Sequence, residues 1–292
     1  MTEQHSHYYL PTPTHWPIFG SIALFCMTFG TASWLHHEWF GPYLVAVGFG
    51  VLIFMMFGWF GTVIYENQKG LYDAQVDRSF RWAMVWFIFS EVCFFGGFFG
   101  ALFYARLQII PTLAGLIAQD EMTHTLLWPN FKGIWPLIQN PSNYDFLNPK
   151  EGMGAWGLAA INTLILLTSG VTVTWAHWSL KLNKRKQLII GMILTVALGI
   201  SFLFCQAHEY YDAYTKMGLT LDSGIYGTTF FMLTGFHGLH VTIGTIMLIV
   251  ILGRCLVGHF TPERHFAFEA VAWYWHFVDV VWLFLFVFVY WL

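Results

Sequence analysis

The sequence has 292 residues, of which 57% are hydrophobic, 20% aromatic and 10% charged. Soluble domains carry about 25% charged residues, so a chain with this little charge cannot cover a water-facing surface and must have lipid as its solvent. The formal net charge of −3, from 13 basic and 16 acidic residues, is too small to indicate nucleic-acid binding.

The N-terminal segment, MTEQHSHYYLPTPTHWP, contains no Lys or Arg and no apolar core. Signal peptides need a basic region followed by an apolar stretch, and transit peptides are rich in Arg. We therefore expect this segment to be neither kind of leader.

Seven segments of the chain are long and apolar enough to cross a bilayer, which takes about 20 residues. The third, sixth and seventh are longer than a perpendicular crossing requires, which indicates tilt or projection beyond the bilayer. The sequence thus predicts an all-α integral membrane protein that forms one membrane domain over residues 1–292. The predicted spans are residues 17–35, 40–65, 80–107, 154–178, 187–208, 224–253 and 266–292.

Basic residues are distributed unequally between the two sides of the predicted spans, and this bias sets the orientation of a membrane protein. The more basic side holds Lys69, Arg78, Arg81, Lys181, Lys184, Arg185, Lys186, Arg254 and Arg264. The opposite side holds Arg106, Lys132, Lys150 and Lys216. This asymmetry predicts a cytoplasmic N-terminus and a C-terminus on the outer, periplasmic side.

The longest connection, residues 108–153, lies on the outer side in this orientation. Its prolines are Pro111, Pro129, Pro136, Pro141 and Pro149. The stretch Ile109–Ala118 is apolar but too short to span a bilayer, so we expect it to lie at the interface or to pack on helix ends.

The four cysteines, Cys26, Cys93, Cys205 and Cys255, stand singly inside or at the ends of apolar stretches. Their positions include no CxxC pair and no Cys/His spacing typical of a metal site. We interpret them as small, buried hydrophobic side chains.

Glu91 lies inside the third predicted span, where an ionisable side chain is costly unless it is partnered or neutral. Its neighbours on the helix surface are all aromatic, namely Phe87, Phe94, Phe95 and Phe98. We therefore predict that Glu91 is uncharged or hydrogen-bonded and faces another helix rather than lipid. A purely structural hydrogen bond between helices would explain this pattern as well as a chemical role would.

In the seventh span, Glu269, Trp273, His276 and Asp279 lie along one helical face. His276 and Asp279 stand three positions apart, so they can contact each other. The face suits a proton relay or a structural clamp, and the clamp is favoured because nothing adjacent resembles a substrate or metal site.

In the sixth span, His237 and His240 stand among glycines in the run GFHGLH. Two histidines supply at most two ligands, fewer than a metal site of four to six ligands needs. Small residues let helices approach closely, so the imidazoles can find partners, and packing is the favoured interpretation. Gly96 and Gly100 in the third span likewise predict a small-residue contact face.

Several residues are placed where the spans meet water. Glu66 ends the second span, and Arg254 ends the sixth on the same side. Arg254 suits either a snorkelling anchor or a group that holds lipid head groups. Trp16, Trp59 and Trp282 suit either the interfacial aromatic belt or packing within the spans.

Three blocks of the sequence resemble helices of the cytochrome c oxidase subunit III family. They are FIFSEVCFFGGFF in the third span, YGTTFFMLTGFHGLHVTIG in the sixth and HFAFEAVAWYWHFVDVVWLFLFVFVYWL in the seventh. The segment HWPIFGS before the first span is also similar to that family. The resemblance runs from about Trp16 to the C-terminus and is most specific toward the C-terminus.

The resemblance implies a seven-helix fold in which the first two helices splay from the other five, leaving a V-shaped cleft filled by phospholipids. It implies that this chain holds no metal or other cofactor and that haem and copper lie in partner subunits. The implied partners are subunit I as the main contact, subunit II in the same complex, and cytochrome c as electron donor. No nucleic-acid partner is implied.

The implied function is that of an accessory subunit, without catalytic residues, in a proton-pumping oxidase whose subunit I reduces oxygen to water. Such a subunit would stabilise subunit I, hold structural phospholipids, support proton uptake and aid oxygen access. By position, Glu91 matches a buried carboxylate facing the cleft and subunit I. The positions that match lipid contacts are Trp59, Glu66 and Arg254. The positions that match polar helix contacts are His237, His240, Glu269, His276 and Asp279.

The chain departs from the family pattern in two places. Where many members read WWRDVIRE at the end of the second helix, this chain reads GWFGTVIYE, with Gly61 and Tyr65 in place of two arginines. We therefore expect head-group binding on that wall of the cleft to be rearranged or weaker. The connection 108–153 is also longer than in compact members, which suggests an additional outer contact and favours a bacterial plasma membrane over a mitochondrial inner membrane.

Three other functions agree less well with the sequence. The equivalent subunit of a quinol oxidase or nitric oxide reductase relative typically lacks the first two spans, so the presence of 17–35 and 40–65 favours the cytochrome c type. A redox catalyst would need more membrane histidines as haem and copper ligands. A transporter would show broken helices and internal symmetry, and neither is evident.

Overall fold

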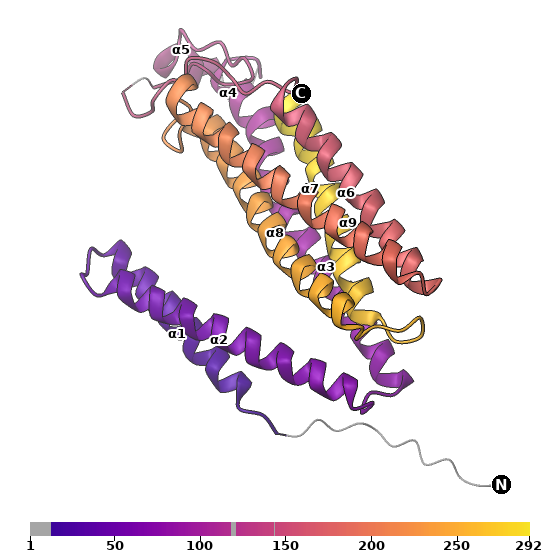
Figure 1. Ribbon diagram of the computed structural model, residues 1–292. Helices are drawn as coiled ribbons and strands as arrows, with labels where there is room; N and C mark the ends of the chain where they lie inside the picture. The colour runs from indigo at the N-terminus through magenta and orange to yellow at the C-terminus, as the bar shows by residue number, and fades with distance from the viewer. Residues whose placement is uncertain (1–12, 118–120, 143) are drawn as a thin grey trace, which may run out of the picture. The chain divides into compact units, whose positions relative to one another are not determined.

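The structure, a computed structural model, describes residues 13–117, 121–142 and 144–292. The expectation about a leader therefore falls largely outside the described residues. All regular secondary structure in the described ranges is helical (Figure 1). The helices are α1 Trp16–Leu35, α2 Gly41–Gln68, α3 Ala74–Tyr104, α4 Ile110–Leu113, α5 Glu121–Leu127, α6 Leu158–Lys181, α7 Arg185–Asp212, α8 Gly224–Val257 and α9 Phe266–Leu285. Short π-helical segments continue three of them, at Ala105–Ile109, Ala213–Met217 and Phe286–Trp291.

Seven helical stretches of the described residues are long and apolar enough to cross a membrane. This confirms the prediction of an all-α integral membrane protein with seven spans. The stretches are Trp16–Leu35, Gly41–Gln68, Ala74–Leu113, Leu158–Lys181, Arg185–Met217, Gly224–Val257 and Phe266–Trp291.

The third span is longer than its predicted range of 80–107. The apolar residues after position 108 continue the helix through the π-helical turn and α4, as far as Leu113. Pro111 falls in the first turn of α4, where its missing N–H is tolerated. The sequence predicts that Ile109–Ala118 lies at the interface or packs on helix ends, whereas its first five residues continue the third span; Ala118 lies outside the described residues.

The chain divides into two compact units, residues 1–80 and 81–292, where the sequence predicts one membrane domain. Each unit is described by itself. The predicted lipid-filled cleft concerns the placement of the two units and stays a prediction.

The first unit is built on the α1–α2 hairpin. Glycines on both helices let the backbones approach closely, because a Cβ placed at Gly48 would lie 2.8 Å from Cγ of Met27. At the other end of the hairpin, the Trp16 indole occupies the space beside Gly58, and its Nε1 donates a hydrogen bond of 3.3 Å to Oγ1 of Thr62.

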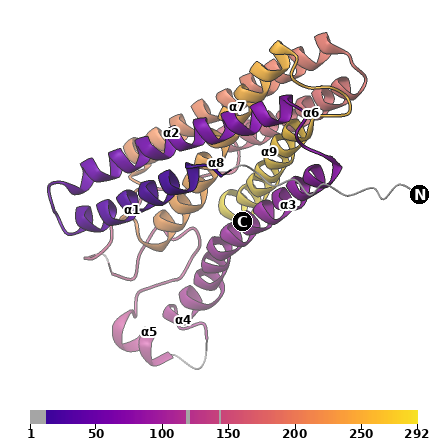
Figure 2. The same cartoon turned by 90° about the horizontal axis from the view of Figure 1, so that it is seen from below.

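In the second unit, α6 packs on α7, α7 on α8, α8 on α9, and α9 back on α6 (Figures 1 and 2). Two tryptophans of α9 fill the centre of this ring and are fully buried. Nε1 of Trp275 donates a hydrogen bond of 2.8 Å to Oγ of Ser169, and Nε1 of Trp282 donates one of 2.9 Å to Oγ1 of Thr163. Of the two roles predicted for Trp282, packing is the one observed.

The part of α3 that belongs to the second unit lies beside α8 and α9 through aromatic contacts. Phe94 packs on Phe236 of α8, and Phe95 packs on Phe277 of α9, with ring centroids 5.0 and 6.1 Å apart. These contacts place Glu91, one turn earlier on α3, against α8.

One packing prediction is wrong in part. Cys255 is buried and Cys26 and Cys205 are half-buried, but Cys93 is exposed. A Cβ built at Gly96 or Gly100 would have no described atom within 4 Å, so the contact predicted at these glycines is not made within the second unit and stays a prediction. Cys93, Gly96 and Gly100 lie on a face of α3 that no other described helix of the second unit covers.

Candidate functional sites

Glu91 and His240 join α3 to α8. His240 Nε2 and Glu91 Oε2 are 2.8 Å apart, and both side chains are largely buried. The rings of Phe94, Phe95, Tyr274 and Phe277 surround the imidazole. The prediction that Glu91 is hydrogen-bonded and faces another helix is confirmed.

A second contact of His240 determines how many protons this pair holds. Its Nδ1 lies 2.6 Å from the carbonyl oxygen of Phe236. A carbonyl can only accept, so Nδ1 carries a hydrogen and donates it. One further proton therefore joins Nε2 to Glu91, as either a carboxylic acid with a neutral imidazole or a carboxylate with an imidazolium. In both cases the pair as a whole is neutral.

His237, one turn before His240, is buried in the ring of helices. Its Nε2 lies 3.2 Å from the carbonyl oxygen of Val278 on α9, and its ring packs on Phe202 and Trp282. The two histidines thus have separate partners, in agreement with the packing interpretation of GFHGLH.

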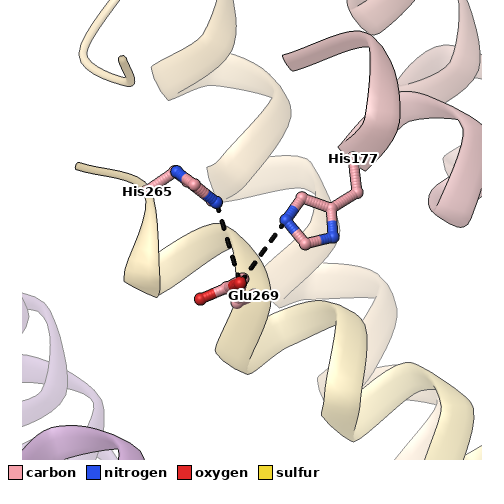
Figure 3. A group of neighbouring side chains, drawn as sticks. All are labelled: His177, His265 and Glu269. Carbon is pink, nitrogen blue, oxygen red and sulfur yellow. Dashed lines mark ion pairs between the residues drawn. The ribbon is translucent and has the colours of Figure 1, made fainter. Parts of the chain in front are cut away.

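Glu269 contacts residues of other elements and not His276 or Asp279, with which it shares a face of α9. Its Oε2 pairs with Nη1 of Arg81 on α3 at 2.5 Å. Its Oε1 lies 3.7 Å from Nε2 of both His177, near the end of α6, and His265, which precedes α9. Figure 3 shows the two imidazoles directed at this carboxylate from separate elements.

His276 and Asp279 form a separate pair, with Nδ1 and Oδ2 3.6 Å apart. Nε2 of His276 is also 3.1 Å from Oγ1 of Thr174 on α6. The three side chains lie in a mostly apolar surface groove between α6 and α9. Glu269 is seven residues before His276, which is about 10 Å along a helix, so the predicted face divides into two sites.

The lipid-contact candidates of the first unit lie toward the end of α2. Trp59 is 49% exposed. Glu66 Oε2 accepts a hydrogen bond of 2.7 Å from the hydroxyl of Tyr72. Tyr65, which stands where the family pattern has an arginine, lies under Nζ of Lys69 at 5.3 Å from the ring centroid.

Arg254 is buried near the end of α8, not free at a surface. Only 9% of the residue is exposed, and the guanidinium lies 4.4 Å from the ring centroid of Phe260. Its Nε is buried without a hydrogen-bond partner among the described residues. The snorkelling interpretation requires an exposed head group and is therefore disfavoured.

Sequence reasoning missed a buried acid on α7. Glu209 is 3% exposed, and its Oε2 accepts a hydrogen bond of 3.0 Å from the hydroxyl of Tyr290. The sequence feature that could have identified it is its position, one residue beyond the predicted span 187–208. His177 and Arg81 were also missed as site residues, because their common partner is distant in sequence.

A comparison with protein families shows to which family this chain belongs. The family described as cytochrome c oxidase subunit III matches residues 5–119 and 141–292. The chain belongs to the cytochrome c oxidase subunit III family. Residues 1–4 and 120–140 lie outside the match, and the second of these segments falls in the long connection after the third span.

Relatives named cytochrome c oxidase subunit 3 match this chain over its whole length. The proteins of Gadus morhua, Canis lupus and Equus caballus are 43%, 42% and 41% identical to it over 292 residues. In each case the match covers all of this chain and 99% of the relative. Membership makes the chain part of an oxidoreductase complex with other oxidase subunits, in the energy-transducing membrane of a respiratory chain.

Proposed function

We propose that this chain is the accessory subunit of a proton-pumping cytochrome c oxidase and has no catalytic residue, haem or copper of its own. In this proposal subunit I reduces oxygen to water, subunit II lies in the same complex, and cytochrome c donates the electrons. The observation that carries the proposal is the match to subunit III over the whole chain. The presence of α1 and α2 favours this function over the equivalent subunit of a quinol oxidase or nitric oxide reductase.

The uncovered face of α3 is our candidate for the contact with subunit I. It carries Val92, Cys93, Gly96, Gly100 and Tyr104, at spacings that align them along the helix, and all are exposed. In lipid, small residues favour helix association because they allow close backbone approach. A helix of subunit I packed on this face would bury it, and the contact would stabilise subunit I.

Phospholipid binding is the second part of the proposal. A buried guanidinium whose Nε lacks a partner is completed by an anion, and the phosphate of a lipid head group supplies one at the cytoplasmic side. We assign Arg254 this role, with Trp59 and Glu66 as lipid contacts in the first unit. The structural phospholipids would then hold the subunit against its neighbours.

Proton uptake and oxygen access form the third part. The Glu91–His240 pair shares one proton within the spans and is neutral as a whole. We propose that this neutral, polar pair supports hydration of the proton path in the neighbouring subunit I without adding a net charge beside it. A Cβ built at Gly96 or Gly97 would have no described atom within 4 Å, and such open space beside an apolar helix suits the passage of an apolar molecule such as oxygen.

For the membrane itself, we propose a bacterial plasma membrane with the N-terminus in the cytoplasm and the C-terminus in the periplasm. The mitochondrial inner membrane is the alternative. The long connection supports the first choice, and the excess of Lys and Arg on one side supports the orientation.

Purification of a tagged chain tests the proposed function. In a mild detergent, we expect the chain to carry haem-bearing and copper-bearing subunits with it, at a fixed ratio of haem to chain. Recovery of the chain without any haem protein would contradict the proposal. Iron or copper bound by the isolated chain itself would also contradict it.

A further inference from the structure

His177, His265 and Glu269 bring three metal-ligating side chains to one point. Nε2 of each histidine and a carboxylate oxygen of Glu269 lie within 4.8 Å of one another (Figure 3). The side chains are 16%, 9% and 12% exposed, in that order. They come from the end of α6 and the start of α9, so the cluster joins two helices.

The hydrogen bonds around the cluster leave both imidazole Nε2 atoms unpaired. Nδ1 of His265 lies 3.2 Å from the carbonyl oxygen of Thr261, which can only accept, so Nδ1 carries the hydrogen of the neutral ring. The lone pair of Nε2 then points toward Oε1 of Glu269. Nε2 of His177 and Nε2 of His265 are buried, and neither has a hydrogen-bond partner among the described residues.

The distances in the cluster suit ligands arranged around one cation better than they suit hydrogen bonds. Each Nε2 lies 3.7 Å from Oε1 of Glu269, beyond the range of about 2.7–3.2 Å for a nitrogen–oxygen hydrogen bond. Ligand atoms each about 2 Å from a tetrahedral zinc ion are about 3.3 Å apart. Small side-chain rotations would therefore bring all three atoms to bonding distance.

The surroundings of the cluster resemble the outer shell of a metal site. Metal-binding histidines commonly donate their other N–H to a backbone carbonyl, as His265 does to Thr261. The ligating carboxylate of a metal site commonly has a further polar partner, and here Arg81 forms an ion pair with Oε2 while leaving Oε1 for the cluster. The ring of Phe268 lies against His177 and limits access by water.

We propose that His177, His265 and Glu269 bind a divalent transition-metal ion of the zinc class. Two imidazoles and one carboxylate fill three positions of a tetrahedral site, and a water molecule completes it. The positive charge of Arg81 opposes the ion, so the site would hold the ion more weakly, and release it more readily, than a fully anionic structural site. The bound ion would fasten the start of α9 to the end of α6.

Zinc binding by the whole oxidase tests the proposal. The purified complex is treated with a chelator, given zinc chloride, freed of unbound zinc and analysed for zinc per haem. We expect His177→Gln and His265→Gln each to remove one zinc equivalent and to weaken binding at this site by at least about tenfold. His208→Gln is the matched control, because His208 is exposed and lies beside Asp212 outside the cluster.

Equal zinc content in the wild type and in the His177→Gln, His265→Gln and His208→Gln variants would overturn the proposal. A shared proton would then be the bridge between imidazole and carboxylate. If the two variants do not assemble, the wild-type complex decides the question by itself. Cryo-electron microscopy with zinc and with chelator should show a zinc-dependent density peak between the three side chains. No such peak would also overturn the proposal.

Discussion

His240 on α8 and Glu91 on α3 are joined by one proton over a distance of 2.8 Å between Nε2 and Oε2. Because Nδ1 of His240 is committed to the carbonyl of Phe236, removal of the acid leaves Nε2 with no protein partner in this contact. The pair fastens α3 to the helix ring within the third and sixth spans, and both side chains are largely buried, so its loss should have a measurable cost.

Removal of the Glu91 side chain should loosen the second unit. We expect Glu91→Ala to destabilise the chain by about 1–3 kcal/mol, because a buried hydrogen-bonding group loses its partner. Glu91→Gln should cost less, since its amide can still donate to Nε2. The midpoint of thermal unfolding of the solubilised complex measures both effects.

Ser90→Ala is the control for this series, because Ser90 is exposed and bonds only to the backbone of its own helix. Its unfolding midpoint should match that of the wild type. Equal stability of Glu91→Ala and Ser90→Ala would show that the pair contributes nothing. Difference infrared spectra of wild type and Glu91→Gln add a direct test, and a carboxyl that titrates as it would in water would rule out the shared proton.

Trp282 should be more important to stability than its exposed counterparts. Trp282→Phe removes a buried indole N–H that donates to Thr163 and leaves unfilled space, so we expect a loss of about 1–3 kcal/mol. Trp178→Phe, at a side chain that is 66% exposed, should change stability by less than about 0.5 kcal/mol. Denaturation of both variants in detergent gives the comparison, and equal losses would disagree with the packing described for α9.

Arg254 should hold an anionic phospholipid. Arg254→Gln removes a charge worth about 1 kcal/mol near the membrane surface, so lipid affinity should fall about fivefold. Lipid mass spectrometry of the purified complex measures this loss, with Arg264→Gln as the control at an exposed arginine. If both variants retain the wild-type amount of anionic lipid, Arg254 does not bind a head group.

Bulky residues at Gly96 or Gly97 should slow the delivery of oxygen. Neither position has a described atom within 4 Å of a built Cβ, so a leucine there meets no atom of this chain. Because Gly96 also lies on the proposed contact face for subunit I, only variants that still co-purify with subunit I are compared. We expect Gly96→Leu and Gly97→Leu to raise the apparent oxygen Michaelis constant severalfold, measured by oxygen uptake. Gly253→Leu, at an equally open glycine on α8, should leave it unchanged. An unaltered constant in all three variants would make this space merely structural.

The spans could be predicted from the sequence because hydrophobic length alone defines them in lipid. Their ends were less predictable where the chain stays helical beyond the bilayer. The extension through Pro111 illustrates this, since a proline reads as a helix end but is tolerated in the first turn of a new segment. Glu91 was recognisable because an acid among phenylalanines requires a partner.

The partners themselves were much less predictable. Positions on one helix show which residues share a face, but not which other helix meets that face. Glu269 was therefore grouped with His276 on its own helix, whereas its contacts are Arg81 of α3, His177 of α6 and the nearby His265. The uncovered glycines of α3 show the same limit, because their expected neighbour is not another described helix of the second unit.

The working life of the oxidase without this subunit tests the central claim most directly. The complex is depleted of this chain, its haem spectrum is recorded, and its activity is followed over many turnovers beside the intact complex. We predict an unchanged haem spectrum together with a shorter catalytic lifetime, because subunit I keeps its metals but loses the protein and lipid that support it. An unchanged lifetime and turnover rate, or loss of a haem signal with the subunit, would contradict the account.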